Sequence, residues 1–103
     1  MHGLYIVGPS APRNVTVTEQ HKTHISLSIQ TNEQEQVNGF RVVCINTRNE
    51  SFNETVKNDS FILLNNLTSG TKYNISVFAT IIVNGSELIS DGAFNLTAYT
   101  RKS

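Results

Sequence analysis

The stretch LTSGTKYNISVFA, residues 67–79, decides how this chain folds. A polar turn around Ser69-Gly70 leads into a run in which apolar and outward-facing residues alternate. One set comprises Tyr73, Ile75, Val77 and Ala79, and the other comprises Asn74, Ser76 and Phe78. A period of two is what a strand with one buried face and one wet face requires. The stretch therefore predicts a turn followed by a long strand.

The same period recurs on both sides of this stretch and predicts six more strands. They cover Val15–Val17, Ile25–Ile29, Phe40–Cys44, Phe52–Val56 (at a sheet edge), Phe61–Leu64 and Phe94–Ala98. Turn dipeptides such as Asn38-Gly39 and Asp91-Gly92 separate the runs, and no helical periodicity is present. The sequence predicts an all-β fold, a seven-stranded antiparallel Greek-key sandwich of immunoglobulin-like architecture.

Length and charge limit the classes of function. The chain has 103 residues, enough for one domain, and eight basic residues balance eight acidic ones. That balance excludes the basic surface of a nucleic-acid-binding protein, and no apolar run is long enough for direct membrane insertion. We expect residues 1–10 to be an N-terminal extension, with Met1 and His2 vector-derived. Residues 11–100 form the expected domain and residues 101–103 a C-terminal tail.

Four segments resemble a fibronectin type III domain over about residues 11–100. Ala11-Pro12 before Val15 resembles the first strand of the family, Ile25–Ile29 the second and Gly39–Val42 the start of the third. Residues 67–73 resemble its turn into the sixth strand. The resemblance implies that Tyr73 buries its ring, that its hydroxyl bonds back to the turn backbone, and that Leu67 closes the end of the sandwich.

Two core positions depart from the family pattern. Ile29 stands where the family usually has Trp, Cys44 stands where it usually has an aromatic residue, and the chain contains no Trp. Both replacements are apolar, so we expect a repacked core with Ile29 as a structural residue. Among family contexts, the density of Asn-X-Ser/Thr triplets resembles the ectodomain repeats of receptor-type protein tyrosine phosphatases and similar adhesion receptors.

N-glycosylation triplets are more frequent than the composition requires. Twelve Asn and 21 Ser plus Thr would give about two or three triplets in random order, whereas eight are present. Those eight asparagines are Asn14, Asn49, Asn53, Asn58, Asn66, Asn74, Asn84 and Asn95. The strand pattern turns Asn14, Asn74 and Asn95 outward and puts the others in turns or at the edge. They predict N-glycans and an extracellular location, as part of a single-pass receptor or a secreted protein.

Two apolar surfaces are candidates for protein binding, either to a protein ligand or to neighbouring domains of the same chain. Leu88 and Ile89 are expected at the tip of a loop over residues 83–92, because loops carry recognition in sandwich folds. The outward residues Val43, Ile45 and Phe78 are expected to form an exposed apolar patch on neighbouring strands. Each surface has a structural alternative: the loop residues fold back over the sandwich end, or the patch packs against another domain.

Catalytic and metal-binding chemistry is not expected. Cys44 is expected to be an inert core thiol, and His21 and His24 lack a third ligand at metal-like spacing. Glu33, Glu35, Glu50 and Glu54 fall in loops or at an edge without an apolar pocket pattern. We therefore expect no catalytic, metal or cofactor site, and any enzymatic activity of a parent protein would lie in another domain.

The leading hypothesis is an extracellular repeat of a glycosylated cell-surface receptor, serving as spacer and protein-binding module. One alternative is a ligand-binding repeat of a cytokine-receptor-like or matrix adhesion protein, although the chain has no Trp-Ser-X-Trp-Ser motif. Another is an intracellular structural scaffold repeat, in which a reduced Cys44 is natural and the triplets are accidental.

Overall fold

The computed structural model describes residues 8–31, 37–57 and 60–103, and these contain strands and turns without any helix. The strands are β1 (Asn14–Gln20), β2 (Ile25–Gln30), β3 (Gly39–Asn46), β4 (Ser51–Lys57), β5 (Phe61–Leu64), β6 (Lys72–Val83), β7 (Ser86–Ile89) and β8 (Phe94–Tyr99). Within this part of the chain, no helix exists that could cross a membrane. The seven predicted strands are all present.

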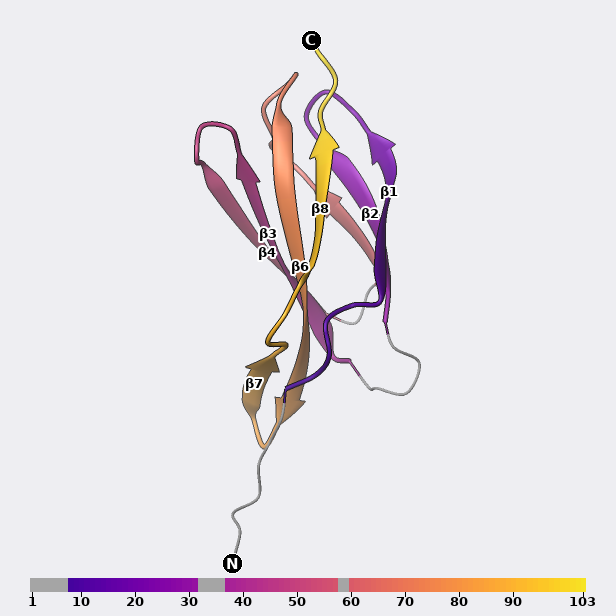
Figure 1. Ribbon diagram of the computed structural model, residues 1–103, viewed down its shortest axis with the longest axis vertical. Helices are drawn as coiled ribbons and strands as arrows, with labels where there is room; N and C mark the ends of the chain where they lie inside the picture. The colour runs from indigo at the N-terminus through magenta and orange to yellow at the C-terminus, as the bar shows by residue number, and fades with distance from the viewer. Residues whose placement is uncertain (1–7, 32–36, 58–59) are drawn as a thin grey trace, which may run out of the picture.

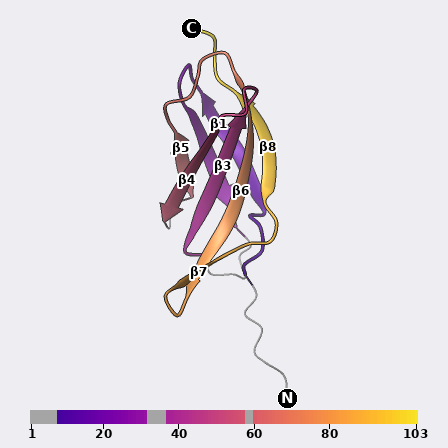
Figure 2. The same cartoon turned by 90° about the vertical axis from the view of Figure 1, so that its left-hand side faces the viewer.

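The strands form two antiparallel sheets that face each other (Figures 1 and 2). The smaller sheet has the order β1-β2-β5, and the larger has β4-β3-β6 followed by β7 and β8. Both β8 and β7 pair with β6, at Lys72–Val77 and at Thr80–Val83 respectively. The crossover from β5 in one sheet to β6 in the other gives the predicted Greek-key sandwich.

The core lies between the sheets and comes from one face of each strand, as the period of two predicts. Its buried apolar residues are Val15, Ile25, Leu27, Ile29, Phe40, Val42, Cys44, Ile62, Leu64, Leu67, Tyr73, Ile75, Val77, Ala79 and Ala98. Ile29 and Cys44, the two departures from the family pattern, are 3% and 0% exposed. The core therefore closes around smaller apolar side chains at both positions.

The turn before β6 has the predicted tyrosine contact. Tyr73 is fully buried, and its hydroxyl accepts a hydrogen bond of 2.7 Å from the backbone N–H of Thr68. Leu67 is 5% exposed, and its N–H donates to the carbonyl of Thr23. These contacts fix the end of the sandwich at which the chain crosses between the sheets.

One segment differs from the sequence-based expectation. The sequence predicts a loop over residues 83–92, but β6 continues to Val83 and β7 pairs back on it. The turn between them is Asn84-Gly85, with φ of 51° and 81°. Two successive left-handed residues are what a tight hairpin needs to match the twist of its strands. The hairpin extends beyond the sandwich at the lower end of Figure 1.

Both ends of the described chain are attached to the sandwich. Pro9 is buried, and Gly8 lies so close to the carbonyl of Ile89 that an added Cβ would be 2.7 Å from that oxygen. At the other end, the Arg101 N–H donates to His21, and the Arg101 carbonyl accepts from Gly70. Residues 8–13 lie toward the hairpin end, whereas the C-terminal tail leaves at the opposite end (Figure 1).

Candidate glycosylation and protein-binding surfaces

The triplet asparagines lie on the surface wherever their side chains are described. Six are exposed: Asn14, Asn49, Asn66, Asn74, Asn84 and Asn95. Asn53 belongs to β4, where its backbone pairs with Val43. Asn58 lies outside the described residues. A glycan on the folded domain needs an asparagine at the surface, and these six asparagines meet that requirement.

Three of these asparagines also have a structural role in turns. Asn49, Asn66 and Asn84 have φ of 61°, 60° and 51°, in the left-handed region. Asn enters that region more readily than other residues with a Cβ, because its short polar side chain hydrogen-bonds locally. Turn geometry therefore gives a reason for Asn at these three positions that is independent of glycosylation.

Asn74 and Asn95 have no such turn role, because they lie on the paired strands β6 and β8. Their triplets run antiparallel, so that Asn74 is opposite Thr97 and Ser76 is opposite Asn95. The Thr97 hydroxyl donates to Asn74 Oδ1 at 3.2 Å, and the Ser76 hydroxyl donates to Asn95 Oδ1 at 2.6 Å. In both side chains the carbonyl oxygen accepts a hydrogen bond, and the amide nitrogen is the atom that would carry a glycan.

The predicted apolar patch lies on the outer face of the larger sheet. Val43 and Phe78 are half-buried, and Ile45 is 39% exposed. Phe78 pairs with Arg41, whereas Ile45 pairs with Asn74. The patch and a triplet asparagine therefore occupy the same face, a coincidence that the sequence alone did not reveal.

Leu88 and Ile89 are not at a loop tip, because Asn84-Gly85 occupies the tip of the hairpin. Both residues lie on β7, opposite Ile81 and Thr80. Leu88 is half-buried and Ile89 is 36% exposed. Since successive strand residues point to opposite faces, the two side chains do not form a single patch. They remain candidate binding residues on separate faces of the hairpin.

An Arg–Glu pair fixes the hairpin to the sheet. Arg41 Nη2 donates to Glu87 Oε1 at 2.6 Å, between β3 and β7. Asn38 Oδ1 accepts from the backbone N–H of Ile82 at 2.8 Å. Ile82 is 55% exposed on this hairpin, and the sequence does not single it out because the residues that follow it, 83–92, are predicted to be a loop.

A second missed surface lies on the smaller sheet. Phe61 and Leu63 of β5 are 66% and 47% exposed. They pair with Ser28 and Ser26, which turns them to the outer face. Alternation within Phe61–Leu64 could have found them, because the buried partners Ile62 and Leu64 define the opposite face.

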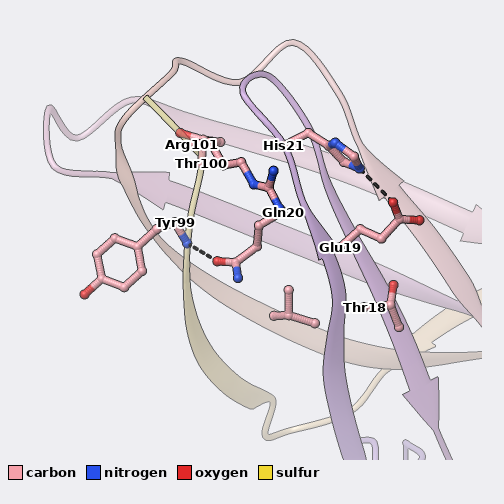
Figure 3. A pocket seen from close by; sticks show the side chains of 8 residues that line it. Thr18, Glu19, Gln20, His21, Tyr99, Thr100 and Arg101 are labelled. Atoms are coloured by element: carbon pink, nitrogen blue, oxygen red, sulfur yellow. Dashed lines mark hydrogen bonds and ion pairs between the residues drawn. The ribbon is translucent and has the colours of Figure 1, made fainter. Parts of the chain in front are cut away.

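His21 lines a hollow of about 570 Å³ between β1 and the C-terminal strand (Figure 3). His21 and His24 stack with ring centroids 4.1 Å apart, and His21 Nε2 is 2.7 Å from Glu19 Oε2. Across the hollow, the Tyr99 N–H donates to Gln20 Oε1 (Figure 3). No cluster of three potential metal ligands occurs in residues 8–31, 37–57 and 60–103. The half-buried histidines are thus stacking residues at a strand end.

The other residues considered for chemical roles are Cys44 and four glutamates. Burial raises the pKa of the Cys44 thiol from 9.0 to about 11, which keeps it protonated and unreactive near neutral pH. Glu50 Oε1 accepts from Asn46 Nδ2 at 3.0 Å within the β3–β4 turn. Glu54 lies on β4, and Glu33 and Glu35 lie outside the described residues.

Comparison with known proteins agrees with this architecture. The family model of the fibronectin type III domain matches residues 10–91. A structure described as a myokine is 25% identical, with a TM-score of 0.73, and the match covers 91% of this chain and 99% of that one. The search of curated proteins gives no match.

Two further structures share the fold at lower identity. The FN1–FN3 domains of chicken CNTN1 are 23% identical with a TM-score of 0.75, covering 93% of this chain and 33% of that one. The FN5 domain of Drosophila Lar is 20% identical with a TM-score of 0.66, covering 92% and 99%. This chain thus spans about one third of the multidomain CNTN1 structure and nearly all of the single-domain one. A fibronectin type III domain is a non-catalytic binding and spacer module.

Proposed function

This chain belongs to the fibronectin type III family, and from that premise we propose that it is an extracellular repeat of a glycosylated cell-surface receptor, acting as spacer and protein-binding module. The parent protein is of the adhesion-receptor class, with the receptor-type tyrosine phosphatases as the specific candidate. The repeat itself takes no cofactor and catalyses no reaction.

One observation carries the proposal. Asn74 and Asn95 lie on regular strands, where Asn is a poor strand former and has no turn to stabilise. Their carbonyl oxygens accept bonds from the hydroxyls of each other's triplets. Two glycosylation triplets at directly paired positions, both exposed, have a ready explanation in glycosylation. Solvation of the two amides on their strands is a weaker explanation of this arrangement.

The spacer role is supported by the positions of the chain ends. Residues 8–13 and the tail after Tyr99 lie toward opposite ends of the sandwich (Figure 1). A repeat of this kind adds its length to a row of domains, because each neighbour attaches at the far end. Leu88, Ile89 and Ile82 on the hairpin end are then placed to contact a preceding domain or a protein ligand.

The intracellular scaffold repeat is kept as a second candidate because two observations favour it. Turn geometry explains the asparagines at positions 49, 66 and 84, so these three triplets no longer support an extracellular location. Cys44 is reduced and buried, as in a cytosolic protein. The binding repeat of a cytokine-receptor-like or matrix protein shares the extracellular location and differs only in its partner.

Intact mass of the domain secreted from eukaryotic cells, before and after enzymatic removal of N-glycans, tests the proposal. We expect a mass loss that corresponds to several glycans, with Asn74 and Asn95 among the modified residues in a peptide map. The deglycosylated protein should remain folded by far-UV circular dichroism. Efficient secretion without a change in mass would contradict the proposal and favour the scaffold candidate.

A further inference from the structure

Asn74 lies in the middle of the larger sheet, with an apolar residue on one side and a hydroxyl on the other. β6 runs between β3 and β8, and Asn74 pairs with Ile45 of β3 and with Thr97 of β8. These three side chains therefore form one row across the outer face. Directly paired residues have Cβ atoms about 4.5–5.5 Å apart, which is contact distance for the groups they carry.

The hydrogen bond to Thr97 sets the direction of the Asn74 amide. Because Oδ1 accepts from the Thr97 hydroxyl at 3.2 Å, the oxygen faces β8. The amide group is planar, and its nitrogen and oxygen leave Cγ in different directions, so Nδ2 points away from the partner of the oxygen on β8. The neighbouring strand on the side away from β8 is β3, where Ile45 is paired with Asn74. A sugar attached to Nδ2 begins on the Ile45 side of the strand.

Ile45 is the most exposed apolar residue of the strand that the amide faces. It is 39% exposed, and Val43, two residues earlier on the same face, is half-buried. Val43 pairs with Ser76, so the apolar strip made by Val43 and Ile45 runs alongside the Asn74-Ile75-Ser76 triplet. The ring face and the N-acetyl methyl of an N-acetylglucosamine are apolar, and covering the strip with them removes apolar area from water.

We propose that the first N-acetylglucosamine of a glycan on Asn74 packs on the apolar strip of Val43 and Ile45. The occupant of this strip is then the chain's own carbohydrate, and the strip is not a docking site for another protein. The proposal rests on the glycosylation proposed above and assigns that modification a structural role at one site.

Asn95 provides a matched contrast on the neighbouring strand. Its Oδ1 accepts from Ser76 of β6, so its Nδ2 is turned away from β6. Its paired residue is a serine and has no apolar side chain to cover. A glycan on Asn95 therefore has no directly paired apolar side chain to cover.

A double-mutant cycle between Asn74 and Ile45 tests this contact. The secreted domain is trimmed enzymatically to a single N-acetylglucosamine at each occupied site, and the melting temperatures of wild type, Asn74→Gln, Ile45→Thr and the double variant are measured. We expect Asn74→Gln to lower the melting temperature by about 3–6 °C with Ile45 present. With Thr at position 45 the same change should have less than half that effect, because the strip is gone.

Two controls isolate the sugar from the amide. The same cycle in bacterially produced, unglycosylated protein should show additive effects, because the bond to Thr97 is lost equally in both backgrounds. A cycle of Asn95→Gln with Ile45→Thr should also be additive in the trimmed protein. In NMR spectra of the trimmed domain, nuclear Overhauser effects should connect the N-acetyl methyl on Asn74 with the methyls of Ile45.

The possible results distinguish the packing of the sugar on Val43 and Ile45 from the broader proposal of a glycosylated extracellular repeat. Occupied Asn74 with additive effects and no methyl contact would overturn the packing while leaving the glycosylated repeat intact. Unmodified Asn74 in the peptide map overturns the packing as well. If the other triplets are also unmodified, the extracellular proposal fails with it.

Discussion

Tyr73 and Asn74 are successive residues of β6 whose side chains leave the strand on opposite faces. Tyr73 is fully buried and bonds back to Thr68, whereas Asn74 is exposed and accepts from Thr97. A shift of one residue in register would bury the amide and expose the phenol. At this scale a single dipeptide fixes both the closure of the core and the direction of a candidate glycan.

Tyr73→Phe tests the tyrosine contact. The ring and its packing remain, but the Thr68 N–H loses the acceptor at 2.7 Å. We expect a loss of about 1–2 kcal/mol in the free energy of unfolding, measured by urea titration. Tyr99→Phe is the matched control, since Tyr99 is 54% exposed, and it should change stability by less than about 0.5 kcal/mol. Equal effects for both variants would refute the assigned role of the hydroxyl.

Cys44 predicts how stability depends on alkaline pH. Its folded pKa of about 11 lies above the ordinary value of 9.0, because burial disfavours the thiolate. The contribution of the protonated thiol is therefore complete below pH 9 and is lost as the pH rises toward 11. Urea midpoints across this window should fall more steeply for wild type than for Cys44→Ala. Identical slopes would show that the thiol is not desolvated.

The β6–β7 hairpin shows what an element adds to its residues. Asn84 and Gly85 both take left-handed φ, and Arg41–Glu87 ties the hairpin to β3. The turn reverses the chain after Val83 and allows β6 to continue past the sandwich. The hairpin thereby presents Ile82 and Ile89 beyond the core, where a neighbouring domain can reach them.

Gly85→Ala tests the turn that forms this hairpin. Gly85 has φ of 81°, and a Cβ added there would meet open space, so the cost is conformational and not steric. We expect a loss of about 1 kcal/mol in the free energy of unfolding. Gly92→Ala meets equally open space without a left-handed φ and should be nearly neutral. Equal costs in thermal unfolding of the two variants would contradict the assigned turn.

The sequence predicts strands and inward faces well because their periodicity is local. Val77 and Ile75 can be placed in the core from alternation alone, and both are buried. The hairpin is missed when Asn84-Gly85 is taken as a loop boundary, although the dipeptide is also the strongest two-residue hairpin signal. The proximity of Ile45 and Asn74 depends on which strands are neighbours and in what register, and those pairings are not encoded in either segment alone.

At the scale of the whole molecule, one core joins the two sheets. Ile25 and Leu27 from the smaller sheet and Ile75 and Val77 from the larger are all at most 1% exposed. Neither sheet can keep its apolar face dry when the other is removed. The sandwich is therefore one cooperative unit.

This cooperativity predicts a single unfolding transition. The chain has three Tyr and no Trp, and Tyr73, buried between the sheets, makes the tyrosine fluorescence sensitive to packing, whereas far-UV circular dichroism reports on the strands. We expect the two urea curves to coincide at every concentration. Separate midpoints would mean that the sheets part before the strands unfold. Tyr73→Phe serves as the control for the fluorescence signal.

The opposite placement of the chain ends determines how this domain responds to tension. β1 and β8 point the same way in Figure 1, the chain enters β1 from the hairpin end, and it leaves β8 at the other end. A pull on both ends drags β1 and β8 in opposite directions along their own axes. The load then falls in shear on the β1–β2 and β6–β8 ladders, whose hydrogen bonds lie across the pull and must break together. In a row of such domains under tension, this one resists stretching as a stiff link and does not unzip strand by strand.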